Sequence, residues 1–312
     1  MPESRTTPVP SDAFREGLLG VAERDLAVHL VEAGDAPTVA GSAFAARFAA
    51  RYLHVRGPGF SSAVAERARD GSVVFAAAPV VELVGPLYPS LVAEVVRARA
   101  RTTLVGVPAP SASVGRSAEP RDDLQAFRGL PSTTVVAPAD GPTVRSATVA
   151  LAERDGPAYL RLPPPDAPPL TDGSFAVGHA PELRPGGDLT LVSYGPTLAL
   201  ALAAADELAR VGLSARVLDV ACLKPIDEGA ILRAARDTGA LLVLEEAPVA
   251  VGVGTLVAAM TAENHPVPVR RLGRPDLWYG PDERPGSGVA GLTLERVRDE
   301  AWELLRLRGR TA

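Results

Sequence analysis

Short apolar runs alternate with stretches of helical periodicity in the second half of the chain. The apolar runs cover residues 189–195, 215–220 and 240–246. Between the first two runs, apolar residues recur at steps of three or four, which predicts one face of a helix over 197–212. They are Leu198, Leu202, Ala205, Leu208 and Val211. Unbroken apolar strands separated by helices predict a parallel sheet that is covered on both faces.

Residues with strong positional preferences mark the ends of these helices. Thr197 is the predicted N-cap of the first helix, and Gly212 its predicted stop. Asp227 is predicted to cap a second helix that runs through Arg236 and ends at Gly239. Strand and helix therefore alternate regularly through this half of the chain.

The first half of the chain has the same rhythm in a less regular form. We predict strands over residues 73–77, 102–107 and 133–138, and helices over 12–24, 61–69, 88–99 and 143–154. The predicted fold class is α/β, with two parallel-sheet α/β domains in series.

A proline-rich stretch separates the two halves. Five prolines lie between Pro163 and Pro169. Such a run cannot donate hydrogen bonds to a sheet and favours an extended, semi-rigid connector. We predict one domain over 12–163, a linker over 164–187 and a second domain over 188–308.

Composition excludes several classes of protein. The net charge of the 312 residues is −5, so no overall basic field recruits nucleic acid. No apolar stretch approaches the length of a membrane span, and the polar, proline-rich start is unlike a signal peptide, so we expect a cytoplasmic location. Cys222 is the only cysteine and the four histidines are scattered, so we predict no metal site within the chain.

Three features of the sequence each allow more than one chemical or structural role. Gly252 and Gly254 precede a predicted helix and offer backbone donors, although a tight strand-to-helix turn is the favoured interpretation. Glu245 and Glu246 end an apolar strand and point to opposite faces, so they do not form one acid/base pair. Lys224, the only lysine, is compatible with a Schiff-base role or with an exposed turn. These residues alone indicate only a two-domain α/β protein.

Longer segments resemble a known family. Residues 188–260 resemble the C-terminal domain of transketolases, with a strand ending in glycine and then the marks D-V, L-K-P-x-D, T-G, E-E and G-x-G. Residues 129–163, with P-A-D and G-P-x-Y-L-R-L, resemble the end of the pyrimidine-binding domain, and residues 12–38 resemble its opening helix and first strand. The resemblance extends from about residue 12 to residue 308.

The resemblance implies an activity, a cofactor and a partner. Transketolase-like enzymes transfer a two-carbon ketol unit and hold thiamine diphosphate between a diphosphate-binding domain and a pyrimidine-binding domain. This chain lacks the G-D-G and later asparagine of the diphosphate-binding domain. The resemblance therefore implies a split enzyme, with thiamine diphosphate and Mg²⁺ at a site shared with a second subunit. The expected assembly is a heterotetramer with a homodimeric core.

The glutamate that activates the cofactor in this family has no acidic counterpart here. Counted from Arg51 and Tyr52, its position is Gly59; counted back from Phe75, it is Gly57. Glu66 lies seven or more residues further on, about 10 Å along a helix, too far for a hydrogen bond. No catalytic residue is therefore identifiable.

Other positions that face the cofactor in the family also differ. An aromatic residue that stacks on the pyrimidine ring aligns with Glu82, and one family histidine aligns with Ala118 and another with Ala247. Tyr88 matches an aromatic of the pyrimidine pocket. By this resemblance, the candidate cofactor-binding residues are Tyr88, Phe60 and Glu82.

Two alternatives remain open. The chain is a non-catalytic structural or regulatory subunit if no chain supplies the missing acid. A relative of the beta subunit of 2-oxo-acid dehydrogenases shares the two-domain plan, and the residues 246–248 and 252–254 favour it, whereas residues 156–162 favour transketolase.

Overall fold

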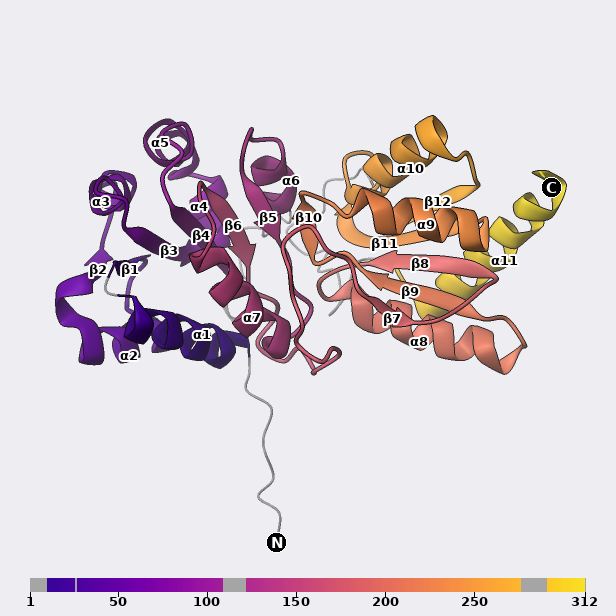
Figure 1. Ribbon diagram of the computed structural model, residues 1–312, viewed down its shortest axis with the longest axis horizontal. Coiled ribbons are helices and arrows are strands. Elements are labelled where there is room, and N and C mark those ends of the chain that lie inside the picture. Colours follow the sequence, from indigo (N-terminus) through magenta and orange to yellow (C-terminus); the bar gives the residue numbers. More distant parts are fainter. Residues whose placement is uncertain (1–9, 26, 109–121, 276–290, 312) are drawn as a thin grey trace, which may run out of the picture. The chain divides into compact units, whose positions relative to one another are not determined.

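The computed structural model describes residues 10–25, 27–108, 122–275 and 291–311 (Figure 1). The chain divides into two compact units, residues 1–177 and 178–312. This division falls inside the stretch that the sequence predicts as a linker. Both units are α/β and each is built on a mostly parallel sheet, which confirms the predicted fold class.

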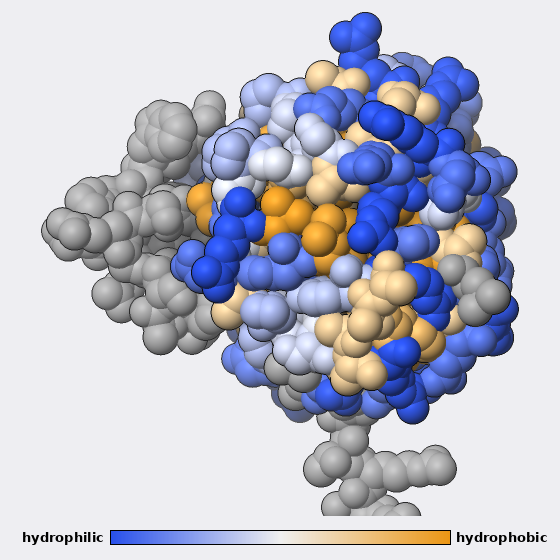
Figure 2. Space-filling model, turned by 90° about the vertical axis from the view of Figure 1, so that its left-hand side faces the viewer, coloured by the Kyte–Doolittle hydropathy of each residue, from blue (hydrophilic) through white to orange (hydrophobic). Residues whose placement is uncertain are grey.

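The first unit contributes parallel strands in the order β5-β6-β4-β3-β1-β2. In chain order they are β1 (Val28–Ala33), β2 (Tyr52–Val55), β3 (Val73–Pro79), β4 (Thr102–Val107), β5 (Thr134–Val136) and β6 (Ala158–Arg161). The central strands are buried along almost their whole length, because helices cover both faces of the sheet. β2 ends the sheet at one side, and all four of its residues are half-buried. Figure 2 shows this side of the molecule, where hydrophilic side chains surround a small apolar patch.

The helices of the first unit lie in two layers (Figure 1). One layer holds α1 (Pro10–Arg24), α2 (Val39–Phe48) and α7 (Gly141–Ala152). The other holds α3 (Phe60–Arg67), α4 (Val80–Val84), α5 (Tyr88–Leu91) and α6 (Asp123–Arg128). A short 3₁₀ turn (Ala49–Arg51) precedes β2. A π turn (Val92–Val96) continues α5, so the helix predicted over 88–99 is helical through Val96 and changes from α to π geometry after Leu91.

The second unit has a sheet in the order β12-β11-β8-β9-β7, parallel except for β7. The strands of this sheet are β7 (Glu182–Arg184), β8 (Leu189–Ser193), β9 (Ala215–Asp219), β11 (Leu241–Pro248) and β12 (Val269–Arg274). The short strand β10 (Cys222–Lys224) follows β9 in the chain and is not part of this sheet. The helices of this unit are α8 (Thr197–Arg210), α9 (Glu228–Thr238), α10 (Val253–Asn264) and α11 (Leu294–Thr311). Within the described ranges, no helix combines the length and apolar character that a membrane crossing requires.

Several helix ends in this unit match the sequence and two do not. Asp227 accepts the Ala230 amide at 2.8 Å, and Gly239 ends α9 with φ +66°, both as predicted. Thr197 is the first helical residue rather than the cap, and its hydroxyl donates to the carbonyls of Tyr194 and Leu244. Val211 lies beyond the end of α8 and is 56% exposed, so it does not belong to the buried face.

A buried carboxylate fastens part of the predicted linker to the first unit. Asp140 accepts the Thr143 amide at 3.0 Å and so caps α7. Its second oxygen accepts the amides of Leu170 and Thr171 at 2.7 and 2.8 Å. The linker is therefore anchored at these residues, and residues 182–184 further along it form β7 rather than a connector.

Candidate functional site

The carboxyl edge of the first sheet holds three of the residues that the sequence analysis singled out, Gly57, Gly59 and Glu82. β2, β1 and β3 are neighbours and parallel, so the loops that follow them meet at one edge. The loop after β2 holds Gly57 and Gly59, the loop after β1 holds Asp35, and α4 after β3 holds Glu82. In α/β sheets this edge is where ligands bind.

A buried carboxylate that the sequence analysis did not select fixes the loop after β1. Glu32 is 1% exposed and accepts the Thr38 hydroxyl at 2.5 Å, the Thr38 amide at 3.3 Å and the Tyr52 hydroxyl at 3.0 Å. Burial and then the Glu32 carboxylate raise the pKa of the Tyr52 hydroxyl. Gly41 makes room for this carboxylate, since a Cβ there would lie 1.7 Å from Glu32 Oε2.

The two glycines that the family resemblance aligns with its activating glutamate have different backbone conformations. Gly57 has φ +80°, a backbone conformation that residues other than glycine rarely adopt. Gly59 has φ −77° and precedes α3 as its N-cap. A Cβ at Gly57 would meet nothing within 4 Å, and one at Gly59 would meet only Val55 Cγ1 at 3.8 Å. Space is open at both residues, but only Gly59 has a backbone that accepts a side chain.

Glu82 is a half-buried acid in the first turn of α4. Burial, followed by the charge of Asp35, raises the pKa of the Glu82 carboxyl. The structure thus brings these two acids close enough to interact at the sheet edge.

The two aromatic candidates occupy different environments. Phe60 is fully buried, so its ring packs in the core and not toward the edge. The Tyr88 hydroxyl donates to the Ala126 carbonyl at 3.0 Å, and its ring meets Phe127 edge to face at 5.7 Å. Burial raises the pKa of the Tyr88 hydroxyl. Tyr88 is half-buried, in contrast to Phe60.

A second buried network lies at the carboxyl end of β6. The Tyr159 hydroxyl donates to Asp123 Oδ2 at 2.5 Å, and Arg161 Nε lies 3.6 Å from the same oxygen. Burial, followed by the Asp123 charge, raises the pKa of the Tyr159 hydroxyl. The Tyr159 ring stacks on Phe127 at 4.2 Å, and a Cβ at Gly106 would lie 2.2 Å from its hydroxyl. Of these residues, Tyr159 and Arg161 belong to the G-P-x-Y-L-R-L motif that the sequence analysis quoted. Ala118 lies outside the described residues.

In the second unit, the Glu245 carboxylate binds the backbone of the turn at Gly252 and Gly254. The Glu245 side chain is fully buried and accepts the amides of Val253 and Gly254 at 2.6 and 3.2 Å. A Cβ at Gly252 would lie 2.0 Å from Glu245 Oε2. The turn therefore caps α10 internally and leaves these donors unavailable to a phosphate.

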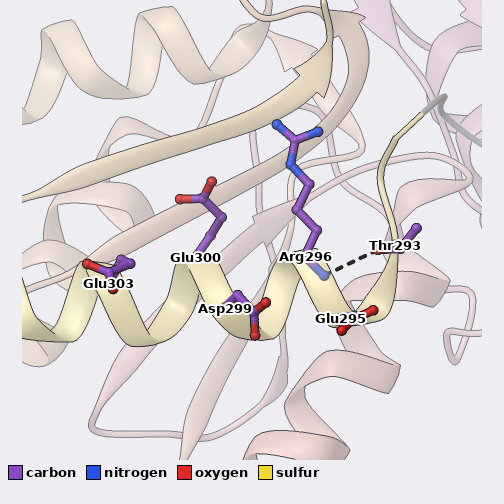
Figure 3. Close-up of a pocket in the computed structure, with 6 residues that line it drawn as sticks. All are labelled: Thr293, Glu295, Arg296, Asp299, Glu300 and Glu303. Carbon is purple, nitrogen blue, oxygen red and sulfur yellow. Dashed lines mark hydrogen bonds between the residues drawn. The ribbon is translucent and has the colours of Figure 1, made fainter.

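A groove of about 400 Å³ runs along α11 (Figure 3). It is lined by Thr293, Glu295, Arg296, Asp299, Glu300 and Glu303. Three of its acids pair with arginines: Asp299 with Arg298 at 3.1 Å, Glu300 with Arg270 at 3.1 Å and Glu303 with Arg306 at 2.6 Å. The groove is thus a solvated helix face with internally balanced charge.

Comparison with known proteins places this architecture in a family. A family model described as the C-terminal domain of transketolase matches residues 178–296. One subunit of the apulose-4-phosphate transketolase from Phocaeicola vulgatus is 30% identical over 272 residues, which cover 85% of this chain and 86% of that protein. The chain belongs to the transketolase family.

Other transketolase relatives match in part. The 6-deoxy-6-sulfo-D-fructose transketolase subunit SqwH from Clostridium sp. (strain MSTE9) is 41% identical over 159 residues, 50% of this chain and 49% of that protein. The match thus spans about half the length of that relative.

Solved transketolase structures share the fold. A structure described as a split gene transketolase, inactive beta4 tetramer, has a TM-score of 0.86 at 28% identity, over 97% of this chain and 99% of that one. A mutant transketolase from Pichia stipitis has a TM-score of 0.72 at 16% identity, over 98% of this chain and 47% of that chain. The latter likeness concerns the fold alone, and it places this chain on about half of a longer transketolase.

Proposed function

We propose that the chain is one subunit of a two-component, thiamine diphosphate-dependent transketolase that transfers a two-carbon ketol unit. A second subunit would carry the diphosphate-binding domain and the Mg²⁺ ion. The proposed assembly is a heterotetramer with a homodimeric core. The activating glutamate is absent from this chain in the proposed enzyme.

The observation that carries this proposal is the length of the match. The chain matches over 97% of its own length and 99% of a structure described as a split gene transketolase, but over only 47% of a Pichia stipitis transketolase chain. The Phocaeicola vulgatus relative, which is covered to 86% of its length, is itself a single subunit of its transketolase. These proportions support a chain that works with a separate partner.

The carboxyl edge of the first sheet fits an aromatic ring, although it lacks the family's acid. The open space beside Gly57 and Gly59 lets a flat group approach the backbone. Glu82 and Tyr88 would hold an aminopyrimidine ring there, and Phe60 would support the loop from the core. Bound thiamine diphosphate would supply the nucleophilic carbon for ketol transfer. Residues of this chain would bind and orient its ring.

A non-catalytic subunit is the second candidate function. Neither Gly57 nor Gly59 carries an acid, and the closely similar split gene structure is described as inactive. In that case the chain would stabilise or regulate its partner, or the partner would supply the acid.

Co-purification and calorimetry distinguish these functions. A tagged chain is recovered from its native cells, and the bound proteins are identified by mass spectrometry. We expect a partner with a G-D-G and a later asparagine. Calorimetry with thiamine diphosphate and Mg²⁺ should then detect binding only with both subunits present. Absence of such a partner contradicts the two-component enzyme, and a complex that binds no cofactor supports the non-catalytic subunit.

A further inference from the structure

α10 differs from the neighbouring helices of the second unit because apolar residues occupy both of its sides. α9, which packs beside it (Figure 1), and α11 both turn mainly charged residues to the solvent. Three residues on the inner side of α10 are buried in the core: Val253, Val257 and Met260. On its outer side, Leu256 is 36% exposed, and Ala259 and Ala262 are exposed as well. A helix that is apolar all round is normally buried on every side.

A further exposed apolar residue lies on the turn that leads from β11 into α10. Val251 in this turn is 50% exposed, and its amide donates to the Pro248 carbonyl at 3.0 Å. Arg271 Nη1 fastens the same turn, because it donates to the Val249 carbonyl at 3.1 Å and to the Thr255 hydroxyl at 2.7 Å. The turn is thus held in one shape, so little conformational entropy would be lost when another surface covers it. The α10 face consists of Val251, Leu256, Ala259 and Ala262.

Opposite charges lie at the two ends of the α10 face. Arg271 lies beside the first turn of α10 through its bond to Thr255, and Glu263 is exposed in the last turn. Within the described ranges of the chain, neither of these two charges is paired with an opposite one. The face is therefore neutral in its middle, basic at one end and acidic at the other. Such a pattern is complementary to a copy of itself that runs in the opposite direction.

We propose that the α10 face binds the α10 face of a second copy of this chain, with the two helices antiparallel across a twofold axis at Ala259. Ala259 is midway between Leu256 and Ala262, so the large side chain of each copy lies opposite the small one of the other. Four residues from the axis, Glu263 lies opposite Thr255 and the Arg271 bound to it, so each charge gains a partner. This inference locates a contact of the proposed homodimeric core and rests on that part of the proposed function.

Crosslinking through an introduced cysteine tests this contact on the full chain purified with its second subunit, or on the full chain alone if none is recovered. The only natural cysteine, Cys222, is buried, so Ala259→Cys adds one accessible thiol to each copy. We expect a short bismaleimide to join two copies into a product of twice the mass of the chain. Ala203→Cys is the matched control, because Ala203 is an exposed alanine on α8, and it should give no such product.

Ala259→Arg tests the strength of the same contact, because it places two like charges at the axis. Sedimentation equilibrium should show a dissociation constant for self-association that is raised at least about a hundredfold. Ala203→Arg should change this constant by less than about threefold. No crosslinked pair from Ala259→Cys, a crosslink to the second subunit only, or equal dissociation constants for the two arginine variants overturns the inference. Absence of a second subunit or of cofactor binding leaves these results unchanged and counts against the proposed enzyme alone.

Discussion

Gly57 and Gly59 stand two residues apart, at the two positions where the family resemblance places its activating acid, yet they permit different substitutions. The left-handed backbone of Gly57 penalises any side chain, whereas Gly59 has an ordinary φ of −77°. The structure therefore identifies Gly59 as the position at which an acid can be introduced without backbone strain.

We predict that Gly57→Ala lowers the free energy of unfolding by about 1–2 kcal/mol, because its φ of +80° is unfavourable for alanine. Gly59→Ala should stay within about 0.5 kcal/mol of the natural chain, since its φ is allowed and its Cβ has space. Urea unfolding of both variants measures the difference. Equal losses would contradict this interpretation of the loop.

His29 gives the first unit a dependence on pH. Burial, followed by the guanidinium of Arg67, lowers the pKa of His29, and Arg67 Nη1 lies 3.2 Å from its Nδ1. Asp70 opposes this shift and Arg51 adds to it. The unfolded chain therefore binds a proton more readily than the folded chain, and stability falls as the pH drops below about 6.5.

Replacing His29 with glutamine should remove part of this acid sensitivity. Urea unfolding between about pH 8 and pH 5.5 compares the natural chain with His29→Gln and with His265→Gln as a control. The slope of unfolding free energy against pH should decrease in His29→Gln only. The same slope in all three proteins would exclude His29 as its source.

Among the elements, the turn that leads into α10 depends on its glycines and on one acid. Gly252→Ala would bring a methyl group to 2.0 Å from Glu245 Oε2, in a fully buried site. We expect it to destabilise the chain by about 1–3 kcal/mol. Gly187→Ala, whose Cβ meets only Ser214 Oγ at 3.9 Å, is the control and should change the midpoint of thermal unfolding little. A Gly252→Ala variant as stable as the control would show that the turn can relax.

The anchored part of the linker leads to a prediction about proteolysis. Asp140→Asn keeps a cap for α7 but loses one acceptor oxygen for the amides of Leu170 and Thr171. A loss of about 1.4 kcal/mol would raise the opened population tenfold, and cleavage within 164–177 should accelerate in proportion. Asp172→Asn, at an exposed turn with Ser174, is the control. Equal cleavage rates would mean that Asp140 does not hold the linker.

Elements that the sequence predicted well are those whose packing makes them uniformly apolar. β3, β4, β8, β9 and β11 are interior strands, and each carries a nearly continuous apolar run. The hydrophobic pattern did not predict β2, because this strand ends its sheet and mixes polar and apolar residues. It did not predict β7, because that strand has only three residues. The pattern did not predict α2 either, because the small residues of this helix give no strong hydrophobic periodicity.

Buried acids are harder to find from the sequence, because their partners are distant in the chain. The donor to Glu32 from β2 is 20 residues away, and the donor to Asp123 is 36 residues away. Glu82, Tyr88 and Phe60 were selected by family resemblance alone. The structure then separates a buried Phe60 from a half-buried Glu82 and Tyr88.

At the scale of the whole molecule, an isolated copy should associate with itself. The proposed partner interface would leave a large surface uncovered, and obligate interfaces commonly bury more than about 2,000 Å². We expect homodimers, larger assemblies or aggregates when the chain is expressed alone. Light scattering after size exclusion measures this, and a monodisperse monomer would contradict an obligate partner.

The Glu32 carboxylate has a consequence for how this edge meets a ligand. Thr38, Tyr52 and the space left by Gly41 hold it in place without any outside group. The loop that carries Asp35 is therefore set during folding, before any encounter with cofactor or partner. Little ordering entropy remains to be lost there on binding, so a ligand at this edge would meet a surface already in its final shape.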